Sequence, residues 1–192
     1  NIILFKPIYN VLTSFTSQFI RLLYPCILNY KNGILITDMD MLPMNRTYYT
    51  KNVELFDNSK FIYYRGNVCF EYKQIATCYN IATNEVWRDI FKINNIEDIR
   101  NYILNVSNNT IIKEGHSNEG WSTDQLVLYE KIMNWNLRTN NLICLDENKT
   151  GYRRLCRASY NEINNIINND ENIINNIQNG LYTDFHCCRP MK

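Results

Sequence analysis

The sequence GILITDMDMLP, residues 33–43, decides how we interpret the fold of this chain. Its apolar run ILIT is typical of a short strand buried on both faces, and a glycine separates it from the helical apolar pattern of residues 14–30. Asp38 and Asp40 follow at the carboxyl end of this strand, where open α/β sheets bind their ligands. Since residues two apart in an extended chain point the same way, both carboxylates are expected to face one divalent cation.

Helical and strand patterns alternate along the rest of the chain, which predicts an α/β fold. Further strands are expected at residues 61–64, 72–83, 142–145, 151–157 and 181–188, and further helices at 84–91, 96–106, 122–133 and 160–178. Ser122 and Gln125 have the spacing of a capping box at the start of the third of these helices. No glycine-rich nucleotide loop of the G-x-G-x-x-G kind is present, so a Rossmann dehydrogenase is not indicated.

Composition and charge exclude several classes of partner. The 192 residues carry a net charge of only +1, which provides no long-range field for a nucleic acid or an anionic membrane. No apolar run approaches the roughly 20 residues that span a bilayer. The seven cysteines form no C-x-x-C pair, which favours free thiols in a reducing compartment, and hence the cytoplasm, over a disulfide framework. The length fits a single domain over residues 1–192.

A second motif is GWSTDQ, residues 120–125, at the start of an expected helix. Asp124 in the first turn is stabilised by the helix dipole and can accept a hydrogen bond from a sugar hydroxyl, and Gln125 lies beside it. The indole of Trp121 can stack on a pyranose ring. The alternative is a simple helix cap next to a core tryptophan, and the residues alone do not separate the two.

A third motif closes the chain, with His186 between Asp184 and Arg189. An imidazole that completes a carboxylate site would favour manganese over magnesium, and Arg189 could bind a phosphate. The alternative is a surface histidine in a C-terminal tail. The other histidine, His116, lies in a polar loop and is expected to be solvated, with a place near the acceptor as the second option.

The chain resembles the GT-A glycosyltransferases, most closely those of large DNA viruses of algae and amoebae. Three segments carry the resemblance in this order: residues 15–44, the GWSTDQ helix start and the closing DFHCCRP. The resemblance implies a mixed sheet flanked by helices. It also implies that Asp38, Asp40 and His186 bind Mn²⁺, with Mg²⁺ as the alternative, on the diphosphate of a nucleotide sugar such as a UDP-sugar.

The resemblance further implies that Arg21 reaches the donor and that Asp124 lies beside the reacting sugar. Asp124 would then be the general base of an inverting enzyme or would stabilise the front face in a retaining one. The acceptor is expected to be a glycan or another hydroxyl compound, and a viral enzyme would work in the host cytoplasm. Such domains begin with a strand-helix-strand unit that holds the base, of which only a remnant fits before Phe15, so we expect a domain that lacks part of this unit.

Two other functions stay open at this point. A phosphatase of the haloacid dehalogenase type also has a D-x-D motif after an apolar strand and uses magnesium, although its Thr/Val position is Leu42 here and its second acidic pair could only be Asp146-Glu147. A non-catalytic module that keeps the same fold is the other alternative.

Overall fold

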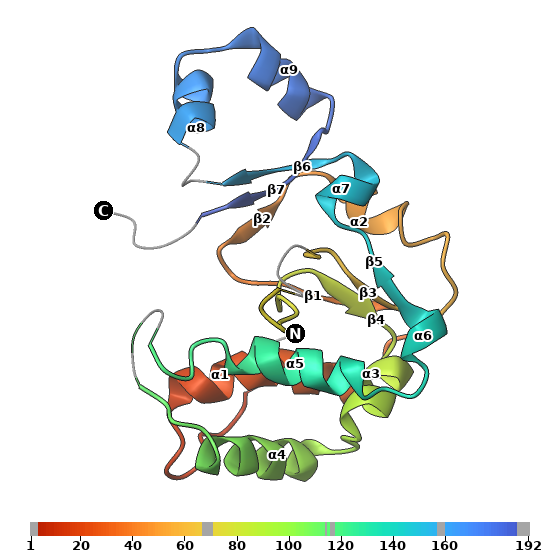
Figure 1. The fold of residues 1–192 in the computed structure, drawn as a ribbon, viewed down its shortest axis with the longest axis vertical. Coiled ribbons are helices and arrows are strands. Elements are labelled where there is room, and N and C mark those ends of the chain that lie inside the picture. The colour runs from red at the N-terminus through yellow and green to blue at the C-terminus, as the bar shows by residue number, and fades with distance from the viewer. Residues whose placement is uncertain (1–3, 67–70, 114, 116–117, 157–159, 188–192) are drawn as a thin grey trace.

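Two mixed β-sheets lie one above the other in the computed structural model of the chain, which describes residues 4–66, 71–113, 115, 118–156 and 160–187 (Figure 1). The lower sheet, sheet A, has the order β1-β4-β3-β5. Its strands are β1 (Ile34–Ile36), β4 (Asn80–Ala82), β3 (Phe61–Tyr63) and β5 (Leu142–Cys144). Only the β3–β5 pair is parallel.

The upper sheet, sheet B, has the order β2-β7-β6. It consists of β2 (Met41–Pro43), β7 (Tyr182–His186) and β6 (Arg153–Cys156), with β2 antiparallel and β6 parallel to β7. The α/β class expected from the sequence is therefore confirmed as two mixed sheets flanked by helices. Among the described residues no helix is both long and apolar enough to cross a membrane.

Four helices lie below sheet A, and the longest of them lies beneath the first (Figure 1). They are α1 (Thr13–Leu23), which continues into a 3-10 turn at Tyr24–Cys26, α3 (Asn84–Phe91), α4 (Ile96–Asn108) and α5 (Thr123–Met133). Their apolar faces form the largest core of the molecule together with sheet A, and its most deeply buried members include Phe15, Phe19, Leu22, Trp87, Ile99, Ile103 and Leu128. Helix periodicity in the sequence located these elements correctly because each one buries a continuous apolar stripe.

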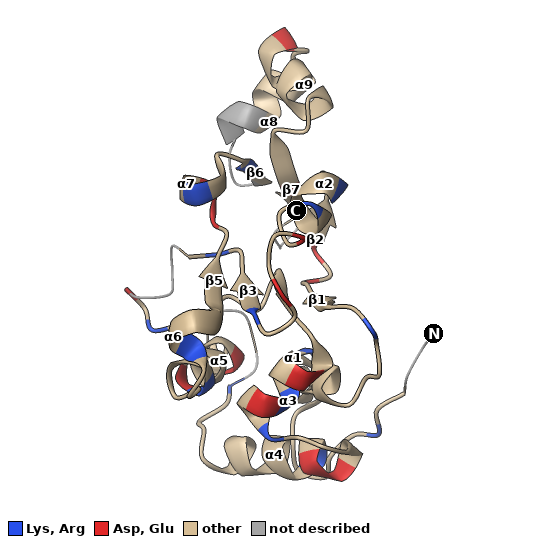
Figure 2. Ribbon diagram, turned by 90° about the vertical axis from the view of Figure 1, so that its right-hand side faces the viewer, with Lys and Arg blue, Asp and Glu red and all other residues tan. Residues whose placement is uncertain are grey.

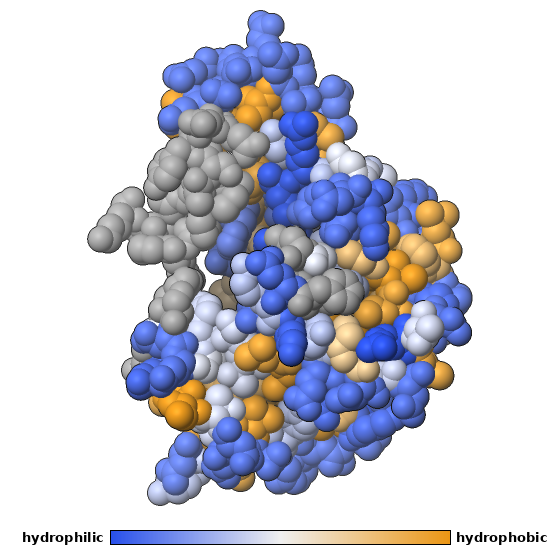
Figure 3. All heavy atoms as spheres, in the orientation of Figure 1, coloured by the Kyte–Doolittle hydropathy of each residue, from blue (hydrophilic) through white to orange (hydrophobic). Residues whose placement is uncertain are grey.

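The connections around sheet B are shorter elements. Helices α2 (Arg46–Thr50), α6 (Arg138–Asn141) and α7 (Glu147–Thr150) are single turns beside the sheets. Helices α8 (Tyr160–Ile167) and α9 (Glu171–Gln178) pack on sheet B through a small apolar cluster centred on Leu155, Ile173 and Tyr182. The outer surface over α9 is largely hydrophilic (Figure 3).

Four local predictions were wrong. β1 is an edge strand with Leu35 37% exposed, not a strand buried on both faces, because it pairs with β4 alone. Residues 72–79 form turns, since the amide of Ile75 bonds to the carbonyl of Gln125 and the amide of Tyr79 to that of Ile36.

The other two errors concern helix starts. The single helix expected over residues 160–178 is divided into α8 and α9, because the Asp170 carboxylate accepts bonds from the amides of Asn172 and Ile173 and so starts a new helix. The capping box at Ser122 does not form. The amide of Gln125 bonds instead to the Asp124 carboxylate, at 2.9 Å.

Candidate active site

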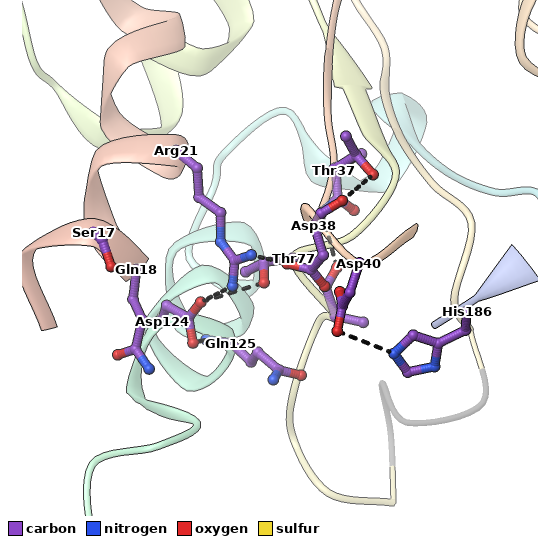
Figure 4. Close-up of polar contacts among 12 residues, drawn as sticks. Ser17, Gln18, Arg21, Thr37, Asp38, Asp40, Thr77, Asp124, Gln125 and His186 are labelled. Carbon is purple, nitrogen blue, oxygen red and sulfur yellow. Dashed lines mark hydrogen bonds and ion pairs between the residues drawn. The ribbon is translucent and has the colours of Figure 1, made fainter. Parts of the chain in front are cut away.

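The Asp38–Asp40 segment is the link between the two sheets. β1 ends at Ile36 in sheet A and β2 begins at Met41 in sheet B, so the chain turns between them, with the Met41 amide 3.3 Å from the Asp38 carbonyl. In this turn the two carboxylates have different neighbours: Asp38 faces Arg21, whereas Asp40 faces His186 (Figure 4). The extended geometry that the sequence predicted for the pair is therefore wrong, because the chain changes sheets here.

Arg21, in the last turn of α1, bridges two carboxylates. Its Nη1 forms an ion pair with Asp38 and its Nη2 lies 2.7 Å from Oδ2 of Asp124. Helix α1 places Arg21 there because the opposite face of the helix is held in the core by Phe15, Phe19 and Leu22. The guanidinium thus connects α1, the end of β1 and the start of α5.

Asp124 is almost completely buried, with 1% of its surface exposed. A buried carboxylate is costly unless donors surround it. Here Arg21 and the hydroxyl of Thr77, at 3.2 Å, both donate to Oδ2, and the amide of Gln125 donates to Oδ1. These three donors hold the carboxylate in one orientation at the first turn of α5.

Strand register brings His186 to Asp40. Met41 pairs with His186 across the β2–β7 ladder, and the amide of Cys187 bonds to the Asp40 carbonyl at 2.8 Å. The Nε2 atom of His186 then lies 3.7 Å from Oδ2 of Asp40, with the two side chains 31% and 33% exposed. Residues almost 150 positions apart in the sequence meet here because β2, the second strand of the chain, pairs with β7, the last.

The charge of this cluster suits a divalent cation. With the imidazole neutral, three carboxylates face one guanidinium, which leaves an excess of two negative charges. Bonds of about 2.1 Å place neighbouring ligands of an octahedral ion about 3 Å apart, so Asp40 and His186 would have to move closer than 3.7 Å to share one ion. No group of three or more His, Cys, Asp or Glu side chains within the described part of the chain is assembled as a metal centre.

The other predicted residues are distributed around this cluster. Trp121 is 42% exposed on the rim, where its carbonyl accepts a bond from Nε2 of Gln18 at 3.2 Å. Gln125 is half-buried beside Asp124. Arg189 and His116 lie outside the described residues.

Sequence reasoning missed two side chains of the cluster, Thr77 and Gln18. Thr77 lies in a segment that the pattern assigned to a strand, and nothing in its neighbours indicates that it would reach Asp124. Gln18 could have been found, because it is three residues before Arg21 on α1, and such residues are neighbours on the helix surface. Its Oε1 atom is buried and accepts no hydrogen bond from the described residues.

Comparison with known proteins adds no identity. No protein-family model, no curated protein and no solved structure matches the chain. The chemistry of the site must therefore be argued from its own residues.

Proposed function

We propose that the chain carries the catalytic centre of a metal-dependent glycosyltransferase of the GT-A type. It would transfer a sugar, in the first instance from a UDP-sugar, to a glycan or another hydroxyl acceptor. The observation that carries the proposal is the meeting of Arg21, Asp38, Asp40, Asp124 and His186, which come from four separate elements, at the junction of the two sheets. The resemblance of the same segments to GT-A enzymes selects this reaction among those that an acidic site can support.

One end of the cluster would bind the cation and the other would bind the sugar. Asp40 and His186, with Asp38 after it releases part of its contact with Arg21, would hold the cation. When bound, Mn²⁺ neutralises charge that develops on a departing nucleoside diphosphate. Asp124 is held in one orientation by its three donors and would accept a bond from a sugar hydroxyl once a local movement at the start of α5 uncovers it, since it is 1% exposed here. Trp121 on the rim offers an apolar face to the ring.

One feature argues against a phosphatase. Its second acidic pair would be Asp146-Glu147. Asp146 instead caps α7 through the amide of Lys149, and Glu147 lies 2.6 Å from Arg154.

The test is release of UDP from UDP-glucose, UDP-galactose and UDP-N-acetylglucosamine in Mn²⁺. We expect Asp38→Asn and Asp40→Asn each to reduce the rate about 100-fold or more, as loss of a charge-stabilising group does in other enzymes. Glu97→Gln is the matched control, because it makes the same chemical change on the exposed surface of α4 and is expected to leave the rate unaltered.

The alternatives give different results in the same preparation. Nitrophenol release from p-nitrophenyl phosphate in Mg²⁺ without UDP release would establish the phosphatase and overturn the proposal. A non-catalytic module would release neither product, and its melting temperature in UDP and Mn²⁺ would not respond to Asp38→Asn.

A further inference from the structure

A cavity of about 500 Å³ lies at the end of sheet A opposite the Asp38–Asp40 turn. Its lining residues lie next to the ends of all four strands of sheet A. Lys31 precedes β1 and Thr83 follows β4. Asn58 and Ser59 precede β3, and Trp135 and Leu137 precede β5. Because Ile34 pairs with Ala82 and Phe61 with Leu142, these four strand ends meet at one edge. The volume is in the range of about 300–1,000 Å³ that is typical of ligand sites.

The floor of the cavity is apolar and held in place. Val86 and Trp135 are each 7% exposed and Leu137 is 54% exposed. The indole Nε1 of Trp135 donates to Oδ2 of Asp89 at 2.7 Å, and Asp89 also accepts from Lys92. The tryptophan is thereby fixed before any ligand arrives.

Three polar side chains on the rim have no partner within the described chain: the ammonium of Lys31, the amide of Asn58 and the carboxylate of Glu85. They offer a donor, a donor-acceptor and an acceptor. Because Asp89 also lines the cavity, its charged groups leave an excess of one negative charge. Helix α3, which carries Glu85 and Asp89, bears acidic positions on its surface in Figure 2. The two carboxylates, Glu85 and Asp89, disfavour an anionic ligand, and the mixture of donors and acceptors on the rim suits an uncharged ligand that is rich in hydroxyl groups.

We propose that this cavity binds one ring of a neutral saccharide, apart from the residues of the candidate active site. A pyranose has an apolar C–H face for Leu137 and the small exposed parts of Val86 and Trp135, and a hydroxyl rim for Lys31, Asn58 and Glu85. The choice of a saccharide over other neutral polar ligands rests on the proposed function, since a glycan acceptor longer than the reacting sugar needs a second point of attachment.

The test is a titration of the ¹⁵N-labelled protein with maltotriose, cellotriose and chitotriose, followed through the indole N–H resonances of Trp87, Trp121 and Trp135. We expect at least one trisaccharide to shift the Trp135 resonance saturably in the millimolar range. Glu85→Ala and Asn58→Ala should each weaken this binding about fivefold, the size expected for loss of one hydrogen bond.

Two control variants separate the cavity from the active site. Glu97→Ala removes the corresponding first-turn carboxylate of α4 and should not change the titration. Asp38→Asn should not change it either, whether or not the enzyme transfers sugar. If no trisaccharide shifts Trp135 up to about 20 mM, or if Glu85→Ala has no effect, the proposal is wrong. A shift of Trp121 alone would also overturn it and would leave the proposed function intact.

Discussion

The two sheets of this molecule are stabilised in different ways. Sheet A rests on four helices and on a core in which Phe19, Leu22, Trp87 and Ile103 are almost fully excluded from solvent. Within the described residues, sheet B shares an apolar cluster with sheet A through Met41 and is otherwise covered by α8 and α9 over a cluster of three buried apolar residues. The candidate site lies across the junction: Arg21, Asp38 and Asp124 belong to the elements of sheet A, whereas His186 belongs to sheet B. Apolar packing therefore positions one half of the site, and strand register positions the other.

A buried polar cluster joins the two sheets beneath His186. Asp184, two residues earlier on β7 and fully buried, accepts bonds from Thr183 and Tyr49 and lies 3.5 Å from Nε of Arg154. Burial and the charge of Asp184 raise the pKa of Tyr49, which keeps its hydroxyl a neutral donor. The Nη1 and Nη2 atoms of Arg154 are buried and have no hydrogen-bond partner in the described part of the chain, although the guanidinium lies over the ring of Tyr79.

The largest expected effect is on the core of sheet A. Phe19→Ala should lower the free energy of unfolding by about 3–5 kcal/mol, because it removes a fully buried ring and leaves a cavity. Ile173→Ala, the matched change in the cluster of sheet B, should cost about 2 kcal/mol, since that cluster can collapse onto the smaller side chain. Urea unfolding followed by circular dichroism measures both. An equal or larger loss in Ile173→Ala would contradict the comparison.

The next effect concerns the joint between the sheets. Arg154→Met should destabilise the protein by about 3 kcal/mol, because it leaves the Asp184 carboxylate buried without its cation. Adding Asp184→Asn should recover part of this loss, since no charge then remains uncompensated. Chemical denaturation of the two single variants and the double variant forms the cycle that measures the coupling. Strictly additive losses would show that the pair contributes nothing to the joint.

Arg21→Lys tests the half of the site that belongs to sheet A. Lysine keeps the charge but lacks the planar fork that contacts Asp38 and Asp124 at once, so we expect UDP release to fall about 10- to 100-fold. Thermal stability should change little, because Arg21 is 28% exposed at its side chain. Steady-state kinetics at saturating Mn²⁺ provide the measurement, and an unchanged rate would remove Arg21 from the site.

The smallest effect should come from Asp89, on the surface of α3. Hydrogen bonds from Lys92 and Trp135 lower the pKa of Asp89 below its ordinary value of 3.8. A lowered pKa in the folded state adds stability above the unfolded value, and this stability disappears as the pH falls through the folded value. Asp89→Asn should therefore reduce the melting temperature at pH 7 by no more than about 2 °C, given the exposure of the group, and the difference should vanish in acid. A difference that grew as the pH fell would contradict this sign.

Much of the fold around sheet A could be predicted from the sequence. The apolar stripes over residues 14–23, 84–91 and 96–108 bury one face of each helix, and a stripe is a local pattern. The turn segment before β4 could not be predicted, because Ile75 and Tyr79 bond to backbone groups from other parts of the chain. The division between α8 and α9 could have been predicted from Asp170, because aspartate is a favoured N-cap residue and it interrupts the apolar pattern.

The candidate site shows the same limit. Asp38, Asp40, Asp124 and His186 were selected from the sequence for their residue types and local settings, and their roles remain predictions. The sequence suggested that the two aspartates act together on one ion, whereas the turn between the sheets directs Asp38 to Arg21 and Asp40 to His186. Thr77 entered the cluster with no local pattern to indicate it.

The sequence by itself determined the α/β class, the positions of the main helices and the residues able to carry acid, base or metal chemistry, because each depends on neighbours within a few positions. Only the tertiary structure decided which of these residues meet. The Asp40–His186 contact depends on the β2–β7 register, and the Asp38–Arg21–Asp124 bridge depends on how α1 packs against α5. Both are contacts between distant segments, whose free energy comes from burying surfaces that no local stretch contains.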